Sequence, residues 1–264
     1  MTPLSTQARG SMVLYRIILA LCILIAWQLA SGTLVAEFFV SKPSAILAAL
    51  QRQVMREHLF FHAGITATEA FAGFLIGGSA GVIAGVALGR IHFLAELLAP
   101  FILAFYSLPK IALAPLFVLW IGIGMWMKIV LTATVVFFLV FLNTFTGVRN
   151  VSRELVTIVR LMGANERQVL GKIVLPSAIT WVFAGLRISV PYALIGAIVG
   201  ELIAANRGLG FVLANASSQF DTAGVFAALI AIMLLAFTLN ALVRVAEGKL
   251  MPWKVSEAAR EITI

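Results

Sequence analysis

Long apolar stretches dominate this sequence and decide what kind of protein it can form. Apolar residues make up 62% of the 264 residues and charged residues only 11%, whereas soluble domains are nearer half apolar and a quarter charged. A helix needs about 20 mainly apolar residues to cross a bilayer. Stretches of about this length lie near residues 13–31, 64–88, 93–121, 129–148, 178–204 and 224–246. We therefore predict an all-α polytopic membrane protein with about six transmembrane helices, in which residues 1–264 form a single transmembrane domain.

Basic residues are unevenly distributed among the predicted loops. With the amino terminus inside, twelve Lys and Arg residues fall on the inner side and five on the outer side, leaving out Lys110 and Arg187 within apolar segments. Cytoplasmic loops of membrane proteins carry the excess of basic residues. Both termini are therefore predicted to be cytoplasmic. The formal net charge of +8 is ascribed to basic loops that face the cytoplasm rather than to nucleic-acid binding.

The residues give little support to catalytic or metal chemistry. The single cysteine, Cys22, excludes an internal disulfide and a thiolate metal cluster. His58 and His62 are four residues apart, but two ligands do not complete a zinc site. The Gly-Lys pair at 171–172 precedes isoleucine, so it does not fit a P-loop. We expect a protein that is not an enzyme, with no cofactor and no metal.

Prolines interrupt the third apolar stretch. Pro100, Pro109 and Pro115 lie within residues 93–121, and proline removes a backbone donor and kinks a helix. A membrane segment tolerates such a break where the freed backbone is buried in protein or lines a cavity. We therefore predict a broken third span. Between the first and second spans, residues 45–62 are predicted to form one interfacial helix after a Pro-Ser pair.

The second span carries glycine at every fourth position, namely at Gly73, Gly77, Gly81, Gly85 and Gly89. This spacing places the five glycines along one helix face, where another backbone can approach closely. We predict a tight helix–helix seam on this face. Whether the seam also slides during a conformational cycle stays open.

Ionisable residues inside a membrane are costly and are treated as functional candidates. The candidates for lining a transport pathway are Lys110, Arg187, Glu201 and Glu69. Other interpretations stay open for each of them. Lys110 could extend to the membrane interface, and Arg187 could hold a hydrogen-bond network between helices. Glu69 could simply be wet at the outer start of the second span, and Glu201 could serve a gate or a contact with another protein.

The most informative polar segment is residues 149–177, between the fourth and fifth spans. Leu155, Ile158, Val159 and Met162 follow helical spacing and predict an amphipathic helix. Such a helix fits either a loop held at the anionic lipid surface or a docking element for a cytoplasmic partner.

A second short helix is predicted in the same segment, after a bend at Gly163. Asn165 can cap it, with Gln168 in the capping-box position three residues later. Pro176 is then expected to restart the chain into the fifth span.

The spacing in this segment resembles the conserved cytoplasmic loop of binding-protein-dependent ABC importer permeases. Gly163, nine residues, Ile173, one residue and Leu175-Pro176 match that signature. The family's EAA triplet is replaced here by Thr-Ile-Val at 157–159, so the contacts made by the triplet do not carry over.

Two further stretches resemble the nitrate/sulfonate/taurine branch of that family. One is residues 108–124, LPKIALAPLFVLWIGIG, in the broken third span. The other combines Gly185-Leu186-Arg187, Gly200-Glu201 and Gly208-Leu209-Gly210, followed by Phe220 and Thr222. The resemblance covers roughly residues 60 to 250.

This resemblance implies the type I importer fold of MetI-like permeases and a bacterial inner-membrane location. The implied partners are a cytoplasmic ABC ATPase dimer, a periplasmic or lipid-anchored substrate-binding protein, and a second permease subunit, expected to be a second copy of this chain. The residues implied to couple to the ATPase are Gly163, Ala164, Asn165, Glu166, Arg167, Leu175 and Pro176.

The implied function is passage of a small solute by alternating access, driven by ATP that a partner hydrolyses. The solute is expected to be an anion such as a sulfonate, taurine, nitrate or an organic acid, or a vitamin precursor. A secondary transporter or channel that acts without an ATPase is the alternative, because broken helices with intramembrane charges occur there too.

Overall fold

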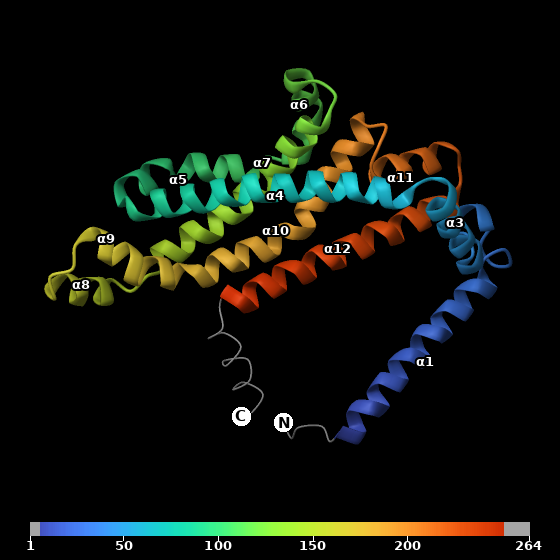
Figure 1. Ribbon diagram of the computed structural model, residues 1–264, viewed down its shortest axis with the longest axis horizontal. Coiled ribbons are helices and arrows are strands. Elements are labelled where there is room, and N and C mark those ends of the chain that lie inside the picture. Colours follow the sequence, from blue (N-terminus) through green and yellow to red (C-terminus); the bar gives the residue numbers. More distant parts are fainter. Residues whose placement is uncertain (1–5, 251–264) are drawn as a thin grey trace.

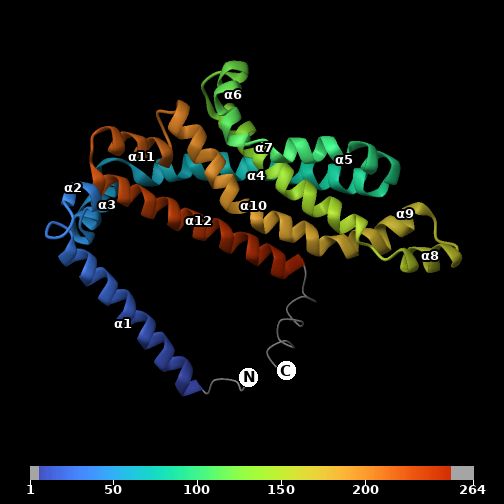
Figure 2. The ribbon, with the colours of Figure 1, turned by 180° about the vertical axis from the view of Figure 1, so that it is seen from behind.

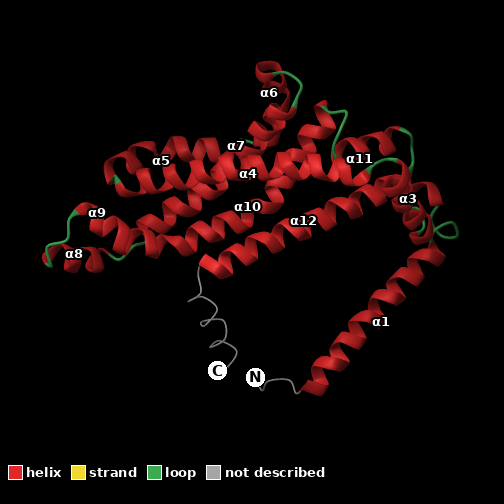
Figure 3. Cartoon of the chain, viewed as in Figure 1, coloured by secondary structure: helices red, strands yellow, loops and turns green. Residues whose placement is uncertain are grey.

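The structure is a computed structural model, and it describes residues 6–250 as helices joined by short loops (Figures 1 and 3). In chain order the elements are α1 (Thr6–Ala30), α2 (Glu37–Val40), α3 (Pro43–Arg56), α4 (Leu59–Arg90), α5 (His92–Ser107), η1 (Lys110–Leu113), α6 (Ala114–Ile121), α7 (Met125–Arg149), α8 (Arg153–Leu161), α9 (Glu166–Val169), η2 (Leu170–Val174), α10 (Leu175–Ala204), α11 (Leu209–Ser218) and α12 (Thr222–Leu250). The helices α8 and α9 lie at one end of the molecule, here called the loop end. The helices α3 and α11 lie at the opposite end, here called the far end (Figure 1).

Apolar length identifies the membrane-spanning helices. Four are long and apolar enough to cross a bilayer: α4, α7, residues 166–204 and α12. The α5 and η1–α6 segments make a fifth if the bent pair is one span. The first predicted span corresponds to α1, whose apolar part, Leu14–Ala30, is shorter than the others. By length and composition, the described residues thus provide four or five of the six predicted spans. The prediction of cytoplasmic termini concerns chain ends that lie outside the described residues.

The third span breaks at Pro109, whereas Pro100 lies inside α5. The axes of its two halves differ by 77° across residues 108–109. Pro109 stands in the break, and Pro115 occupies the first turn of α6, where its missing N–H costs no hydrogen bond. As a result α6 projects from the bundle in both ribbon views (Figures 1 and 2).

The predicted helix over residues 45–62 is wrong at its end. The helix α3 stops at Arg56, and His58 has φ +52°, a left-handed conformation that no helix continues through. The helix α4 then begins at Leu59. His58 and His62 therefore do not share one helix face, and the described residues contain no group of three or more potential metal ligands.

The centre of the molecule is a layer of three helices in which α7 packs between α4 and α10 (Figure 2). The five glycines spaced four apart in α4 all face α7. A Cβ atom at Gly81 would lie 2.8 Å from the carbonyl oxygen of Phe137, and one at Gly77 would overlap the backbone of Ala133. On its other side, α7 meets Gly196 and Gly200 of α10. Small residues on both neighbours therefore let three backbones lie close together.

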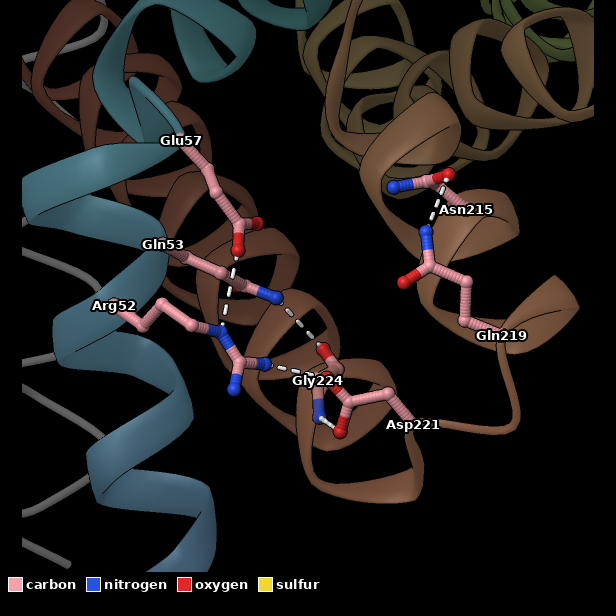
Figure 4. A network of polar contacts seen from close by, with 7 residues as sticks. All are labelled: Arg52, Gln53, Glu57, Asn215, Gln219, Asp221 and Gly224. Carbon is pink, nitrogen blue, oxygen red and sulfur yellow. Dashed lines mark hydrogen bonds and ion pairs between the residues drawn. The ribbon is translucent and has the colours of Figure 1, made fainter.

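The far end is held together by side chains that join α3 to the start of α12 (Figure 4). Arg52 forms ion pairs with Asp221 and, at 3.2 Å, with Glu57. The Gln53 amide donates to the carbonyl oxygen of Gly224 at 2.9 Å. These contacts fix the amphipathic helix α3 across the ends of the long helices, which is where an interfacial helix is expected.

Candidate functional site

The segment 149–177 forms two helical pieces separated by a glycine bend. Ser152 accepts a hydrogen bond from the Leu155 N–H and caps α8. Gly163 has φ +87°, a conformation that residues with a Cβ rarely adopt. The predicted capping box is confirmed: the Asn165 side chain accepts from the Gln168 N–H, and the Gln168 side chain accepts from the Asn165 N–H, both at 2.9 Å.

The second piece is not a separate short helix, contrary to the prediction. Residues 166–204 form one continuous helical segment of 39 residues, in which α9 passes through the π-helical turn η2 into α10. Pro176 does not interrupt this segment, because it lies two residues after Val174, the last residue of the wide π turn, in the first turn of α10. At ~1.5 Å per residue the segment is about 58 Å long. Pro191 lies inside α10, where proline removes a backbone donor and favours a bend in the helix.

The helix α8 turns its apolar side outward. Leu155 and Ile158 are half exposed, and Leu161 and Met162 are 83% and 81% exposed. The opposite side of α8 packs through Val156 onto a core that joins the ends of α7 and α10. Of the predicted apolar face, only Val159 is partly buried. An apolar surface of this kind on a polar loop is typical of a contact with another protein or with a membrane.

Glu166 ties the bend to the surrounding helices. One carboxylate oxygen pairs with Arg90 at the end of α4, at 3.0 Å, and the other pairs with Arg160 of α8, at 2.7 Å. Arg167 is exposed beside it, and Ala164 packs partly buried behind the bend. The acid predicted to contact a partner therefore also holds the two helical pieces in their relative orientation.

At the far end, Glu201 is buried and binds the loop that follows α10. Its carboxylate accepts hydrogen bonds from the Gly210 N–H at 2.6 Å and from the Thr66 hydroxyl at 2.7 Å. Thr66 in turn accepts from the Leu209 N–H at 2.8 Å. These acceptors satisfy the free N–H groups at the start of α11, where a negative charge is stabilised by the helix dipole. Gly208, at φ +108°, leaves room for the carboxylate. Glu201 thus joins α4, α10 and α11.

Glu69 is buried rather than exposed to water. It is 1% exposed and forms an ion pair with Lys128, which is itself 6% exposed. The prediction missed Lys128, which it assigned to an outer loop, because α7 begins four residues before the apolar stretch that was used to place this span. The signal that could have found it is its spacing, which places it one turn into a helix that starts after Gly124.

The Glu69–Lys128 pair lies at the edge of an open hollow of about 800 Å³ at the far end. The α6–α7 connection and the α10–α11 loop form its other walls, and Arg207 stands on the latter. Among the described residues, this hollow brings together an acid and two bases from three elements. It does not include Lys110, Arg187 or Glu201.

Lys110 and Arg187 lie apart from this hollow. Lys110 stands at the break of the third span, donates to the carbonyl oxygen of Tyr106, and lies 4.7 Å and 4.8 Å from the ring centres of Tyr106 and Phe138. Arg187 of α10 forms an ion pair with Glu247 of α12. Both cations therefore have partners inside the chain.

These features define a class of protein: a helical membrane protein, with long spans packed on a central helix and an exposed apolar helix on one polar loop. The chain belongs to the family of binding-protein-dependent transport system inner membrane components, the permease subunits of ABC importers, whose family model matches residues 77–251.

Relatives with transport names are similar over nearly the whole chain. It is 33% identical to the formylaminopyrimidine transport permease protein ThiX of Halalkalibacterium halodurans, over 89% of this chain and 93% of that protein. It is 30% identical to the putative aliphatic sulfonates transport permease protein SsuC of Bacillus subtilis, over 91% and 87%. It is also 30% identical to the taurine transport system permease protein TauC of Escherichia coli, over 89% and 87%.

Solved structures share the fold. An inward-facing structure of the MetNI methionine ABC transporter matches with a TM-score of 0.52 at 21% identity, over 71% of this chain and 93% of that one. An amino acid ABC transporter matches with a TM-score of 0.59 at 16% identity, over 76% and 98%. The fold is therefore that of the MetI-like importer permeases, as predicted.

Proposed function

We propose that this chain passes a small anion across the bacterial inner membrane by ATP-driven alternating access. The observation that carries the proposal is the exposed apolar side of α8, which sits beside a continuous 39-residue helical segment that reaches the far end. An ATPase that docks on α8 would move this segment as a lever, and Glu201 lies near the opposite end of it. A few kcal/mol of differential binding is enough to bias two packing arrangements of this kind.

The proposed orientation places the loop end, with both termini, in the cytoplasm and the far end outside. A cytoplasmic ABC ATPase dimer would then bind Leu155, Ile158, Leu161 and Met162, with Gly163 as the bend and Glu166 and Arg167 beside it. A substrate-binding protein, periplasmic or lipid-anchored, would deliver solute to the far end. In the hollow there, Arg207 is in excess over the Glu69–Lys128 ion pair, and this positive charge supports an anionic solute. The named relatives that transport sulfonates and taurine support the same class.

A second permease subunit completes the proposed assembly, and we propose a second copy of this chain. One copy offers one α8 surface, whereas an ATPase dimer offers two equivalent docking sites, so symmetry favours a homodimer. The exposed residues Leu119, Trp120 and Ile123 on the projecting α6 segment support a partner or lipid on that side. Cross-linking of Ile123→Cys in a Cys22→Ala background would report a dimer. Mixed tagged and untagged copies would show whether both come from this chain.

The proposed function is tested with the assembly purified from native cells in mild detergent and reconstituted into liposomes. We expect uptake of taurine or an alkanesulfonate that needs ATP and the co-purifying binding protein. Leu161→Asp should lose the ATPase and uptake together, because it places a charge in the docking surface, whereas Leu161→Met should retain both. Uptake that persists without ATP and follows a proton gradient would instead establish a secondary transporter.

A further inference from the structure

A second hollow, at the loop end, is lined by an unusual number of arginines. It measures about 390 Å³ and lies between the ends of α4 and α7 and the inner side of α8. Its charged walls are Arg90, Arg149, Arg153, Arg160 and Glu166. Hereafter it is called the arginine hollow.

The charges in the arginine hollow do not balance. Four guanidinium groups face one carboxylate, which leaves an excess of three positive charges. Glu166 uses one oxygen for Arg90 and the other for Arg160, so both of its oxygens are occupied. Arg149 lies 5.7 Å above the Phe145 ring, and neither Arg149 nor Arg153 has an ion pair within residues 6–250. Positive charges gathered at this density repel one another unless an anion joins them.

The proposed docking surface and the arginine hollow use different sides of α8. Arg153, Val156, Thr157 and Arg160 line the hollow, whereas Leu155, Leu161 and Met162 point away from it and do not line it. An occupant of the hollow would therefore sit between α8 and the ends of the membrane helices. It would not need to leave when a protein binds the exposed side of α8.

We propose that the arginine hollow binds a phosphate-class anion through Arg149 and Arg153, with Arg90 and Arg160 held beside it by Glu166. Arginine presents a planar set of donors that matches phosphate oxygens in pairs. The phosphate has two plausible sources. If α4 and α7 span the bilayer, the hollow at their ends lies at the depth of the lipid headgroups, where basic pockets between helices bind anionic lipids. A soluble phosphate compound has the same chemistry. The binding itself does not rest on the proposed function.

The test measures binding to the full-length chain purified in detergent and stripped of lipid. Native mass spectrometry compares the binding of phosphatidylglycerol with that of phosphatidylcholine, and thermal unfolding is followed with and without pyrophosphate. We expect Arg149→Gln and Arg153→Gln each to weaken binding roughly tenfold, the effect of losing one charge-assisted hydrogen bond. Lys172→Gln is the matched control, because Lys172 is an exposed cation at the same end that does not line the hollow.

Glu166→Gln should change the affinity for the anion in the opposite direction to the arginine substitutions. It removes the only carboxylate among the described residues that line the arginine hollow, and with it the negative charge that repels a bound anion. The Gln side-chain oxygen can still accept a hydrogen bond from Arg90 or Arg160, so the site is retained and binding should become tighter. A folding defect cannot mimic this gain. The unfolding midpoint of each variant without ligand shows whether a loss reflects the site or the fold.

The outcomes distinguish the two sources of phosphate, and some of them would overturn the proposal. Preference for phosphatidylglycerol with the expected pattern of variants supports a lipid headgroup, and the same pattern with pyrophosphate alone supports a soluble phosphate. Equal binding of both lipids together with no response to pyrophosphate would overturn the proposal. So would an equal loss in Lys172→Gln. Arginine variants that bind both probes normally but fail to recover the ATPase would assign the hollow to an acidic protein surface instead.

Discussion

At Gly77, the α4 backbone lies so close to α7 that a methyl group would overlap the backbone of Ala133. A backbone cannot move aside as the end of a flexible side chain can. The two helices would therefore have to shift apart along their contact, which costs free energy of folding. The same helix carries Gly64, around which a Cβ would meet nothing within 4 Å. Comparing alanine substitutions at the two glycines therefore separates the effect of packing from the effect of helix propensity.

We expect Gly77→Ala to destabilise the protein by about 1–3 kcal/mol. Gly64→Ala should be neutral or stabilise by up to about 1 kcal/mol, because alanine favours a helix over glycine. Thermal unfolding of both variants in detergent measures the difference. Equal stability of the two would contradict a close α4–α7 seam.

The Glu69–Lys128 pair is the second feature at the residue scale. Both side chains are nearly fully buried, and removal of one partner leaves an uncompensated charge in a medium of low dielectric constant. The charge of each residue is therefore stabilised in the protein interior only while the other residue is present.

Glu69→Gln and Lys128→Met should each cost about 3–5 kcal/mol. The double variant should cost less than the sum, because neither charge remains unpaired. The wild type, the two single variants and the double variant form a double-mutant cycle. Their unfolding free energies give the coupling energy between the two side chains. Additive effects would show that the two charges are solvated independently, with the hollow at the far end extending to both.

At the scale of elements, the bend between α8 and the segment 166–204 depends on one backbone conformation. Gly163 adopts φ +87°, and a Cβ there would meet nothing within 4 Å. Space is therefore available, and the constraint is the conformation alone. Asparagine tolerates left-handed conformations better than alanine does.

This difference predicts a graded effect on coupling. Gly163→Ala should strain the bend by about 1 kcal/mol or more and raise the ATP consumed per solute transported. Gly163→Asn should lie between Gly163→Ala and the wild type. The ratio of ATP hydrolysis to uptake in proteoliposomes is the measurement. If alanine and asparagine behave alike, the left-handed conformation is not what matters.

The capping box strengthens the same element. Asn165 and Gln168 satisfy N–H groups at the start of a helix that has no other cap. Because η2 continues this helix into α10, the cap marks the true start of the fifth span. The loop end and the far end are therefore joined by one continuous helical segment, which contains the π turn η2 and Pro191.

At the scale of the whole molecule, the loop end and the far end face opposite sides of the membrane if the long helices span it. Phe220, at the far end, is 74% exposed, and Leu161, at the loop end, is 83% exposed. The chain contains one native cysteine, Cys22, so a background without cysteine needs a single substitution.

In a Cys22→Ala background, a membrane-impermeant maleimide should label Phe220→Cys in intact spheroplasts. Leu161→Cys should react only after the membrane is opened. Labelling of both from outside would contradict the proposed orientation, and the reverse pattern would invert it. Equal labelling of both denatured variants provides the control for reactivity.

Local patterns in the sequence were sufficient for several parts of this protein. Apolar length predicts the all-helical membrane fold, the prolines predict the broken third span, and the Asn165–Gln168 spacing predicts the capping box. The glycine spacing likewise predicts which face of α4 meets a neighbour. Each of these depends on residues within a few turns of one another, so no knowledge of distant contacts is needed. The motif spacing around Gly163 predicts the family for the same reason.

Only the tertiary structure decided which polar groups meet. Thr66 and Glu201 are 135 residues apart, and Thr66 and Leu209 are 143 apart, so no local pattern relates them. The burial of Glu69 with Lys128 depends on how α4 and α7 pack, and the outward direction of the apolar side of α8 depends on what Val156 packs against. Hydropathy records the cost of placing a charge in a membrane but not the partner that offsets it, because that partner comes from another helix.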